Sequence, residues 1–121
     1  MKILIAEDDP VTQSLVAAAL KPYGYQLLLA NTGDEAYRII MTEPVDLLIS
    51  DIRMSGGTGI QLLRRVRRIR SQGNTAPTVI IMTGLLGERE AYLRRLGACE
   101  VLRKPLDLKR LVNVVRSCLK A

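Results

Sequence analysis

The sequence contains no histidine, no tryptophan and no phenylalanine, and its 121 residues include only two cysteines. Without histidine, the chain has no imidazole base for a Ser-His-Asp or Cys-His catalytic apparatus, and it lacks the commonest protein ligand of transition metals. Two cysteines are too few for a disulfide framework, so we expect Cys99 and Cys118 to be reduced thiols. Any chemistry must therefore use carboxylates, hydroxyl groups, lysine or a metal ion.

The sequence also lacks a long hydrophobic run. No apolar run approaches the ~20 residues that a membrane-spanning helix needs, and the apolar start at residues 3–6 ends at Glu7. We therefore expect no membrane span, no signal peptide and no membrane partner, and we predict a cytoplasmic protein. A chain of 121 residues that is 48% hydrophobic and 25% charged is typical of one globular domain, covering residues 1–121.

The charge is not balanced, because 18 Lys and Arg residues against 12 Asp and Glu residues give a net charge of +6. This excess favours anionic partners without identifying one. Five of the arginines lie in one predicted helix: Arg64, Arg65, Arg67, Arg68 and Arg70. At helical spacing Leu62, Val66 and Ile69 form an apolar stripe, and most of these arginines point away from it. No motif that inserts into a nucleic-acid groove accompanies them, so we expect a solvated face and no direct nucleic-acid binding.

Short apolar runs alternate with longer amphipathic stretches along the whole chain. The apolar runs predict strands at Lys2–Ala6, Gln26–Ala30, Asp46–Ser50, Thr78–Thr83 and Cys99–Leu102. The amphipathic stretches predict helices at Pro10–Lys21, Gly33–Met41, Gly59–Ser71, Glu88–Leu96 and Leu108–Leu119. Several strands are apolar without alternation, which indicates burial on both faces. Five strands, each followed by a helix, therefore predict a doubly wound parallel α/β sheet.

Polar residues follow these predicted strands, and the carboxyl ends of parallel strands lie on one edge of the sheet, where ligands bind. That edge would carry Glu7 and Asp8 after the first strand, Asp51 after the third, Thr83 at the end of the fourth and Lys104 after the fifth. Clustered carboxylates repel one another unless they share a cation. Mg²⁺ prefers oxygen ligands and is commonly held by one or two carboxylates together with phosphate oxygens. We therefore predict a magnesium site that also accepts a phosphate.

This set of residue types suits phosphoryl transfer. Asp51 would attack phosphorus as a carboxylate nucleophile, and Lys104 and Thr83 would hold the phosphoryl oxygens. A metal-dependent phosphatase on a related sheet would use the same residue types. Each residue alone has an ordinary structural explanation, such as a helix N-cap for Asp9 or a turn for Asp51. The prediction depends on their arrival at four strand ends of one edge.

Four motifs then point to a known family. They are residues 3–10, ILIAEDDP; residues 46–54, DLLISDIRM, running on to Gly59; Thr83-Gly84; and Gly97-Ala98 with LRKP at residues 102–105. Together they resemble the receiver domain of bacterial two-component response regulators over essentially all 121 residues. The resemblance implies a flavodoxin-like (βα)5 fold with strand order 2-1-3-4-5.

The resemblance also implies roles for individual residues. Asp51 would accept a phosphoryl group from a sensor histidine kinase or a phosphotransfer protein. Mg²⁺ would be bound by Glu7, Asp8, Asp51 and the backbone carbonyl of Arg53. Arg53 and Leu85, two positions beyond the phosphoacceptor and the threonine, would control the access of water to the phosphoryl group. A downstream output domain or partner protein would receive the signal.

The sequence departs from the family pattern in two places. Residues 55–57 read Ser-Gly-Gly where the family usually has a proline after the methionine, so we expect a less stiff loop. Val101 stands three residues before Lys104, where relatives commonly carry Tyr or Phe, so no large ring can move there. A degenerate receiver that binds partners without phosphate is therefore an alternative function. The retained acidic residues, threonine and lysine argue against that alternative.

Overall fold

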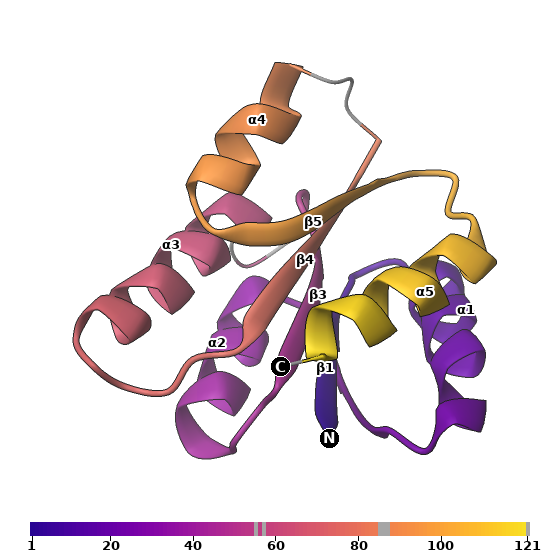
Figure 1. Cartoon of the computed structure of the whole chain (residues 1–121), viewed down its shortest axis with the longest axis horizontal. Helices are drawn as coiled ribbons and strands as arrows, with labels where there is room; N and C mark the ends of the chain where they lie inside the picture. The colour runs from indigo at the N-terminus through magenta and orange to yellow at the C-terminus, as the bar shows by residue number, and fades with distance from the viewer. Residues whose placement is uncertain (55, 57, 85–87, 121) are drawn as a thin grey trace.

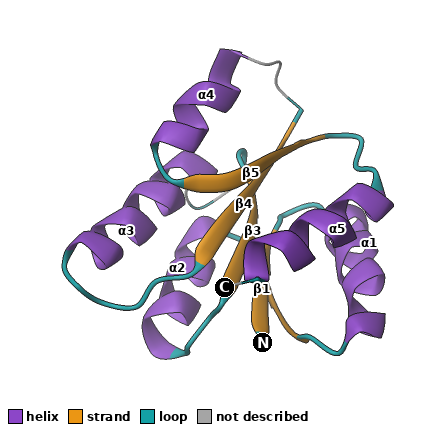
Figure 2. Ribbon diagram, in the orientation of Figure 1, coloured by secondary structure: helices purple, strands orange, loops and turns teal. Residues whose placement is uncertain are grey.

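The computed structural model describes residues 1–54, 56, 58–84 and 88–120 of the chain. These residues form five parallel strands in the order β2-β1-β3-β4-β5, joined by helices (Figures 1 and 2). The strands are β1 (Lys2–Ala6), β2 (Gln26–Ala30), β3 (Leu47–Asp51), β4 (Thr78–Thr83) and β5 (Ala98–Arg103). The helices are α1 (Pro10–Leu20), the short 3-10 turn η1 (Lys21–Tyr23), α2 (Gly33–Thr42), α3 (Gly59–Ser71), α4 (Glu88–Arg95) and α5 (Leu108–Leu119). The predicted doubly wound sheet and its strand order are confirmed.

Most boundaries agree with the prediction to within one residue, and the difference that bears on the acidic edge is at β3. The strand begins and ends one residue later than expected, so Asp51 is its last residue rather than the residue after it. The ladder reaches Asp51 because this residue pairs with Met82 of β4, and the N–H of Ile52 then donates to the Met82 carbonyl at 3.1 Å. The nucleophile proposed from the sequence is therefore held by sheet hydrogen bonds and not by a free loop.

Helices cover both faces of the sheet, as the continuous apolar strands predict. In Figure 1, α2, α3 and α4 lie on one side and α1 and α5 on the other. Alternate strand residues divide between two apolar clusters, with Leu4 and Leu48 facing α2–α4 and Ile3 and Ile5 facing α1 and α5. Burial of each of these large side chains contributes about 1.5–3 kcal/mol. Packing on both faces fixes the strand ends that carry the site.

Helix caps explain where several helices begin. Asp9 accepts hydrogen bonds from the N–H groups of Val11 and Thr12, as the prediction of an N-cap requires. Asp107 caps α5 in the same way, and Thr58 forms a capping box with Gln61 at the start of α3. Asp9 is thus the N-cap of α1, a structural role that distinguishes it from the preceding Glu7 and Asp8.

The arginine-rich helix α3 has the expected arrangement. Leu62 and Val66 are buried, Ile69 is half-buried, and the five arginines are exposed. Arg65 stacks over the Tyr37 ring of α2, with 4.6 Å between the guanidinium carbon and the ring centroid. Among the described residues, no helix combines the length and the apolar character that crossing a bilayer requires.

Candidate functional site

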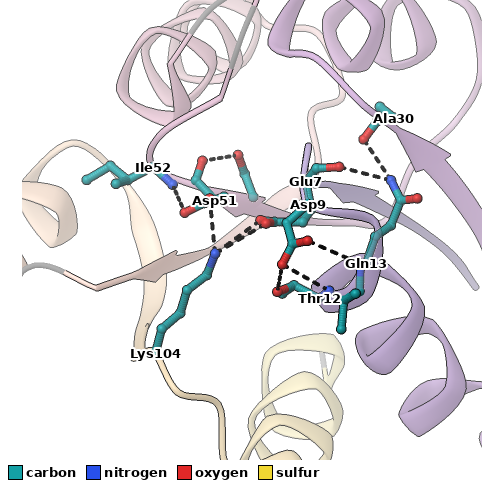
Figure 3. Close-up of polar contacts among 10 residues, drawn as sticks. Glu7, Asp9, Thr12, Gln13, Ala30, Asp51, Ile52 and Lys104 are labelled. Carbon is teal, nitrogen blue, oxygen red and sulfur yellow. Dashed lines mark hydrogen bonds and ion pairs between the residues drawn. The ribbon is translucent and has the colours of Figure 1, made fainter.

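The structure brings the side chains predicted from four different strands to one edge of the sheet. Lys104, which directly follows β5, places its Nζ atom 3.1 Å from Oδ2 of Asp51 (Figure 3). The same Nζ atom lies 3.3 and 3.4 Å from the two carboxylate oxygens of Glu7. Residues separated by 53 and 97 positions in the sequence therefore meet through one ammonium group.

The backbone around Asp51 is tightly fixed. Its Oδ1 atom accepts a hydrogen bond from the N–H of Ile52 at 2.8 Å, and its carbonyl accepts one from the Ser50 hydroxyl at 2.9 Å. Gly59 packs so closely that a Cβ atom there would lie 2.3 Å from the Asp51 carbonyl oxygen. Only glycine allows the start of α3 to approach the strand end this closely. One carboxylate oxygen of Asp51 is thus held by the backbone while the other faces Lys104.

The backbone of Glu7 is held by a side chain that the sequence analysis did not single out. Gln13 of α1 is buried, and its Nε2 atom donates to the carbonyl oxygens of Glu7, at 3.1 Å, and of Ala30, at 3.0 Å (Figure 3). It thereby links the end of β1 to the end of β2. A glutamine near a helix N-terminus gives no signal of this role in the sequence, because its partners are backbone atoms of two different strands.

Burial and neighbouring charges set the protonation of the site. Burial, together with the negative charge of Asp51, raises the pKa of Glu7 to about 7, although Lys104 opposes the shift. Burial alone would lower the pKa of Lys104, but its hydrogen bond to Asp51 and the charges of Asp51 and Glu7 raise that pKa. Lys104 therefore remains charged and acts as the cation between the two carboxylates.

The acidic cluster has the composition of a magnesium site. Glu7, Asp8 and Asp51 can each offer a carboxylate oxygen, and these oxygens lie within 4.8 Å of one another. Glu7 is 1% exposed and Asp51 is 8% exposed, whereas Asp8 is exposed and closes the cluster toward solvent. Hard oxygen donors with an open side fit Mg²⁺, which keeps several water ligands. Asp9 is not one of the three residues of this cluster, and the Thr12 hydroxyl lowers the pKa of its carboxyl group.

The remaining predicted residues surround a hollow above Asp51. The hollow has a volume of about 280 Å³ and is lined by Asp51, Ile52, Arg53, Gly84 and Lys104. Thr83 is buried at the end of β4, and its carbonyl accepts a hydrogen bond of 2.8 Å from the N–H of Lys104. Arg53 is exposed at the rim, and Leu85 lies outside the described residues. The hollow is therefore open to solvent and bordered by Lys104 and an Asp51 carboxylate.

Comparison with known proteins identifies the family. The model of the response regulator receiver domain matches residues 3–116. The chain belongs to this family. The receiver domain is 28% identical to the Protein PilH of Pseudomonas aeruginosa, over 98% of this chain and 97% of PilH. It is 32% identical to the sensor histidine kinase RcsC of Salmonella typhi, over 92% of this chain but only 11% of RcsC. The chain thus spans about a ninth of the length of this curated relative.

Solved structures agree with this assignment. The receiver domain of the Francisella response regulator 1452 superposes with a TM-score of 0.87 and 28% identity, covering 98% of this chain and 96% of that one. A two-component response regulator from Clostridium difficile gives a TM-score of 0.88 and 26% identity, covering 99% and 96% of the two chains. This receiver domain therefore has both the fold and the sequence pattern of two-component systems.

The two departures from the family pattern lie in different surroundings. Val101 is 6% exposed and belongs to the apolar cluster beneath α4, together with Leu93 and Ile81. In the loop after β3, residues 55 and 57 lie outside the described residues, so the expected loss of stiffness stays a prediction. Gly56 has a φ of +68°, and its carbonyl accepts a 2.8 Å hydrogen bond from the N–H of Asp34. This receiver domain thus anchors Gly56 to the start of α2.

Proposed function

We propose that this receiver domain, residues 1–121, is a cytoplasmic switch that accepts a phosphoryl group on Asp51 from a histidine kinase or a phosphotransfer protein. The observation that carries the proposal is the contact of Lys104 with both Asp51 and Glu7 at the edge of the sheet. In the transfer, the Oδ2 atom of Asp51, which contacts Lys104 Nζ in this structure, attacks the phosphorus of a phosphohistidine. A P–O bond forms as the P–N bond breaks, and the histidine leaves as a neutral imidazole whose released nitrogen takes up a proton from solvent.

The other residues support this step through charge and position. Lys104 would move from the carboxylates to an oxygen of the transferred group, and Thr83 would donate its hydroxyl hydrogen to another. Glu7, Asp8, Asp51 and the Arg53 carbonyl would hold Mg²⁺, which neutralises charge on the phosphoryl oxygens when it is bound. The hydrogen bond from the N–H of Ile52 to Oδ1 orients the carboxylate so that Oδ2 faces Lys104, which lines the same hollow.

The signal would leave through the segment that follows Thr83. A phosphoryl group adds about two negative charges, which attract Thr83 and Lys104 toward Asp51. The polypeptide that begins at Gly84 leads directly into α4, so a movement of Thr83 would displace α4 and the surface it offers to an output domain or partner protein.

The experiment is phosphorylation of the purified chain by acetyl phosphate and Mg²⁺, followed by measurement of the intact mass. We expect one added phosphoryl group in the wild type and none in Asp51→Asn. Asp107→Asn is the matched control, because asparagine caps a helix as well as aspartate and the residue is exposed. An adduct that persists in Asp51→Asn would contradict the assignment.

A second incubation, with a phosphate ester in place of acetyl phosphate, separates the alternatives. Turnover of many ester molecules per protein chain would indicate a metal-dependent phosphatase, whereas stoichiometric labelling of Asp51 without such turnover supports the switch. Absence of any adduct, with Mg²⁺ present, would indicate a module that binds partners without phosphate.

A further inference from the structure

A second pair of reactive side chains lies at the opposite end of β5 from Lys104. Cys99 follows the first residue of β5, and Cys118 lies in the last turn of α5. Both are free cysteines, and their Sγ atoms are 2.7 Å apart. A disulfide bond has a sulfur–sulfur distance of about 2.05 Å, so an approach of only about 0.7 Å would join them. Cys99 is exposed and Cys118 is half-buried, so reagents in solution can reach the pair.

An irregularity in the sheet accounts for this approach. Val79 of β4 pairs with Ala98, but the next residue, Ile80, pairs with Glu100. Cys99 is therefore the extra residue of a β-bulge, a feature that redirects a side chain from the regular alternation. Arg94 donates from Nη1 to the Cys99 carbonyl at 3.3 Å, which fixes the backbone at this point. The bulge holds the Cys99 side chain against α5.

We propose that Cys99 and Cys118 form a dithiol site that reacts with low-molecular-weight disulfides, such as oxidised glutathione, and closes reversibly into an intramolecular disulfide. This site is separate from the acidic edge and does not depend on phosphoryl transfer. Its product covalently joins β5 to the end of α5.

The different exposure of the two thiols gives the order of reaction. The Cys99 thiolate attacks one sulfur of the small disulfide, forming a mixed disulfide and releasing the first thiolate, which takes up a proton. Burial, and then the hydrogen bond and charge of Cys99, raise the pKa of Cys118 to about 12, so Cys118 is the weaker first nucleophile.

Modification of Cys99 activates its partner. A mixed disulfide at Cys99 carries no thiolate charge, so the contributions of Cys99 to the pKa of Cys118 disappear. The contribution of burial remains, so the pKa of Cys118 falls only in part and a minor thiolate fraction reacts. This thiolate, its proton released to solvent, attacks Cys99 Sγ, which closes the protein disulfide and expels the second small thiolate. In total the protein loses two electrons and two protons, and one small disulfide becomes two thiols.

The experiment treats the full chain with increasing ratios of oxidised to reduced glutathione, alkylates the remaining thiols, and measures intact masses and disulfide-linked peptides. We expect the wild type to lose the mass of two hydrogen atoms, to take up no alkyl group, and to yield a Cys99–Cys118 linked peptide. Dithiothreitol should restore both thiols. In Cys118→Ser, the reaction should stop at a glutathione adduct on Cys99.

A double variant, Ser117→Cys with Cys118→Ser, is the matched control. It keeps two thiols but moves one of them by one position, about 100° around the helix. We expect this variant to need at least about a tenfold higher ratio of oxidised to reduced glutathione before an intramolecular disulfide forms. Closure at the same ratio in the control, covalent dimers, or stable glutathione adducts in the wild type would overturn the proposal.

Discussion

The two ends of β5 carry different long-range contacts. At its carboxyl end, Lys104 joins Glu7, which directly follows β1, to Asp51, the last residue of β3. At its amino end, Cys99 meets Cys118 of a helix that packs on one face. Lys104 lies five positions after Cys99, which corresponds to about 17 Å along an extended strand. The contacts of Lys104 lie at the edge where the parallel strands have their carboxyl ends, whereas the contact of Cys99 with Cys118 depends on a single β-bulge. We therefore expect changes at one end of β5 to leave the contacts at the other end intact.

The largest expected effect comes from removing the cation at the carboxyl end. Lys104→Met should slow phosphorylation by acetyl phosphate by about a hundredfold or more, because the transferred oxygens lose a charged partner. Mg²⁺ should still bind, since the variant removes a competing positive charge and keeps all three carboxylates. Lys109→Met, on the exposed surface of α5, is the control. A rate within a factor of about three of the wild type in Lys104→Met would exclude a role in transfer.

The same contrast explains what the sequence could predict. Sheet topology places Glu7, Asp51, Thr83 and Lys104 on one edge whatever the details of the loops, so the strand pattern alone was enough to group them. The contact of Cys99 with Cys118 was not predictable, because the residue pattern of this strand gives no sign of a bulge. The sequence predicts only that Cys99 and Cys118 are reduced thiols, and the structure places their sulfur atoms 2.7 Å apart.

Other features that could not be predicted from the sequence also depend on contacts between separate elements. Gln13 bonds to carbonyl groups of two strand ends, and backbone partners leave no pattern in a sequence. The one-residue shift of β3 toward Asp51 depends on pairing with Met82 of the neighbouring strand. Local propensity determines which elements form, whereas these contacts depend on how separate elements meet.

Oxidation at the amino end is expected to change stability without changing acceptor chemistry. A disulfide that closes a loop of about 20 residues stabilises the fold by about 3 kcal/mol, which corresponds to a rise in Tm on the order of 10 °C for a domain of this size. Differential scanning calorimetry of oxidised and reduced protein should show this rise, and Cys99→Ser should show none. Labelling of Asp51 by acetyl phosphate should proceed at the same rate in both forms. A large change in that rate would show that the two ends of β5 are coupled.

The pH dependence of the unfolding free energy tests the raised pKa of Glu7, the buried carboxyl group that contacts Lys104 at the carboxyl end of β5. The pKa of Glu7 is raised from 4.5 to about 7 in the folded protein, so the folded state binds more protons than the unfolded state between these values. The contribution of Glu7 to stability is therefore fully present below about pH 4.5 and is lost as the pH rises through 7. The loss amounts to up to about 3 kcal/mol in the absence of Mg²⁺.

Urea unfolding with a chelator present, from pH 4.5 to 8, measures this loss. The difference in unfolding free energy between the wild type and Glu7→Gln should fall across the range, because glutamine does not titrate. Glu43→Gln, at an exposed ion pair with Lys2, should track the wild type closely. A constant difference between wild type and Glu7→Gln would show that Glu7 does not carry the shifted proton.

The smallest effect on phosphoryl acceptance is expected at Val101, midway between the two ends of β5. Its side chain packs beneath α4 with Leu93, and it has no ring that could exchange between a buried and an exposed position. Val101→Ala should therefore lower stability by about 1–3 kcal/mol through the cavity it leaves, while labelling of Asp51 stays nearly unchanged.

The route of the signal should follow from the same packing. Because Thr83 leads through Gly84 toward α4, beryllofluoride, a mimic of the phosphoryl group, should shift the amide NMR signals of residues 84–95 far more than those of residues 100–102. In Val101→Ala the shifts of residues 84–95 should persist, since a smaller side chain beneath α4 leaves Thr83 and Lys104 in place. Shifts confined to residues 100–102, or loss of labelling in Val101→Ala, would instead make β5 the moving part, and its two ends could no longer be treated as independent.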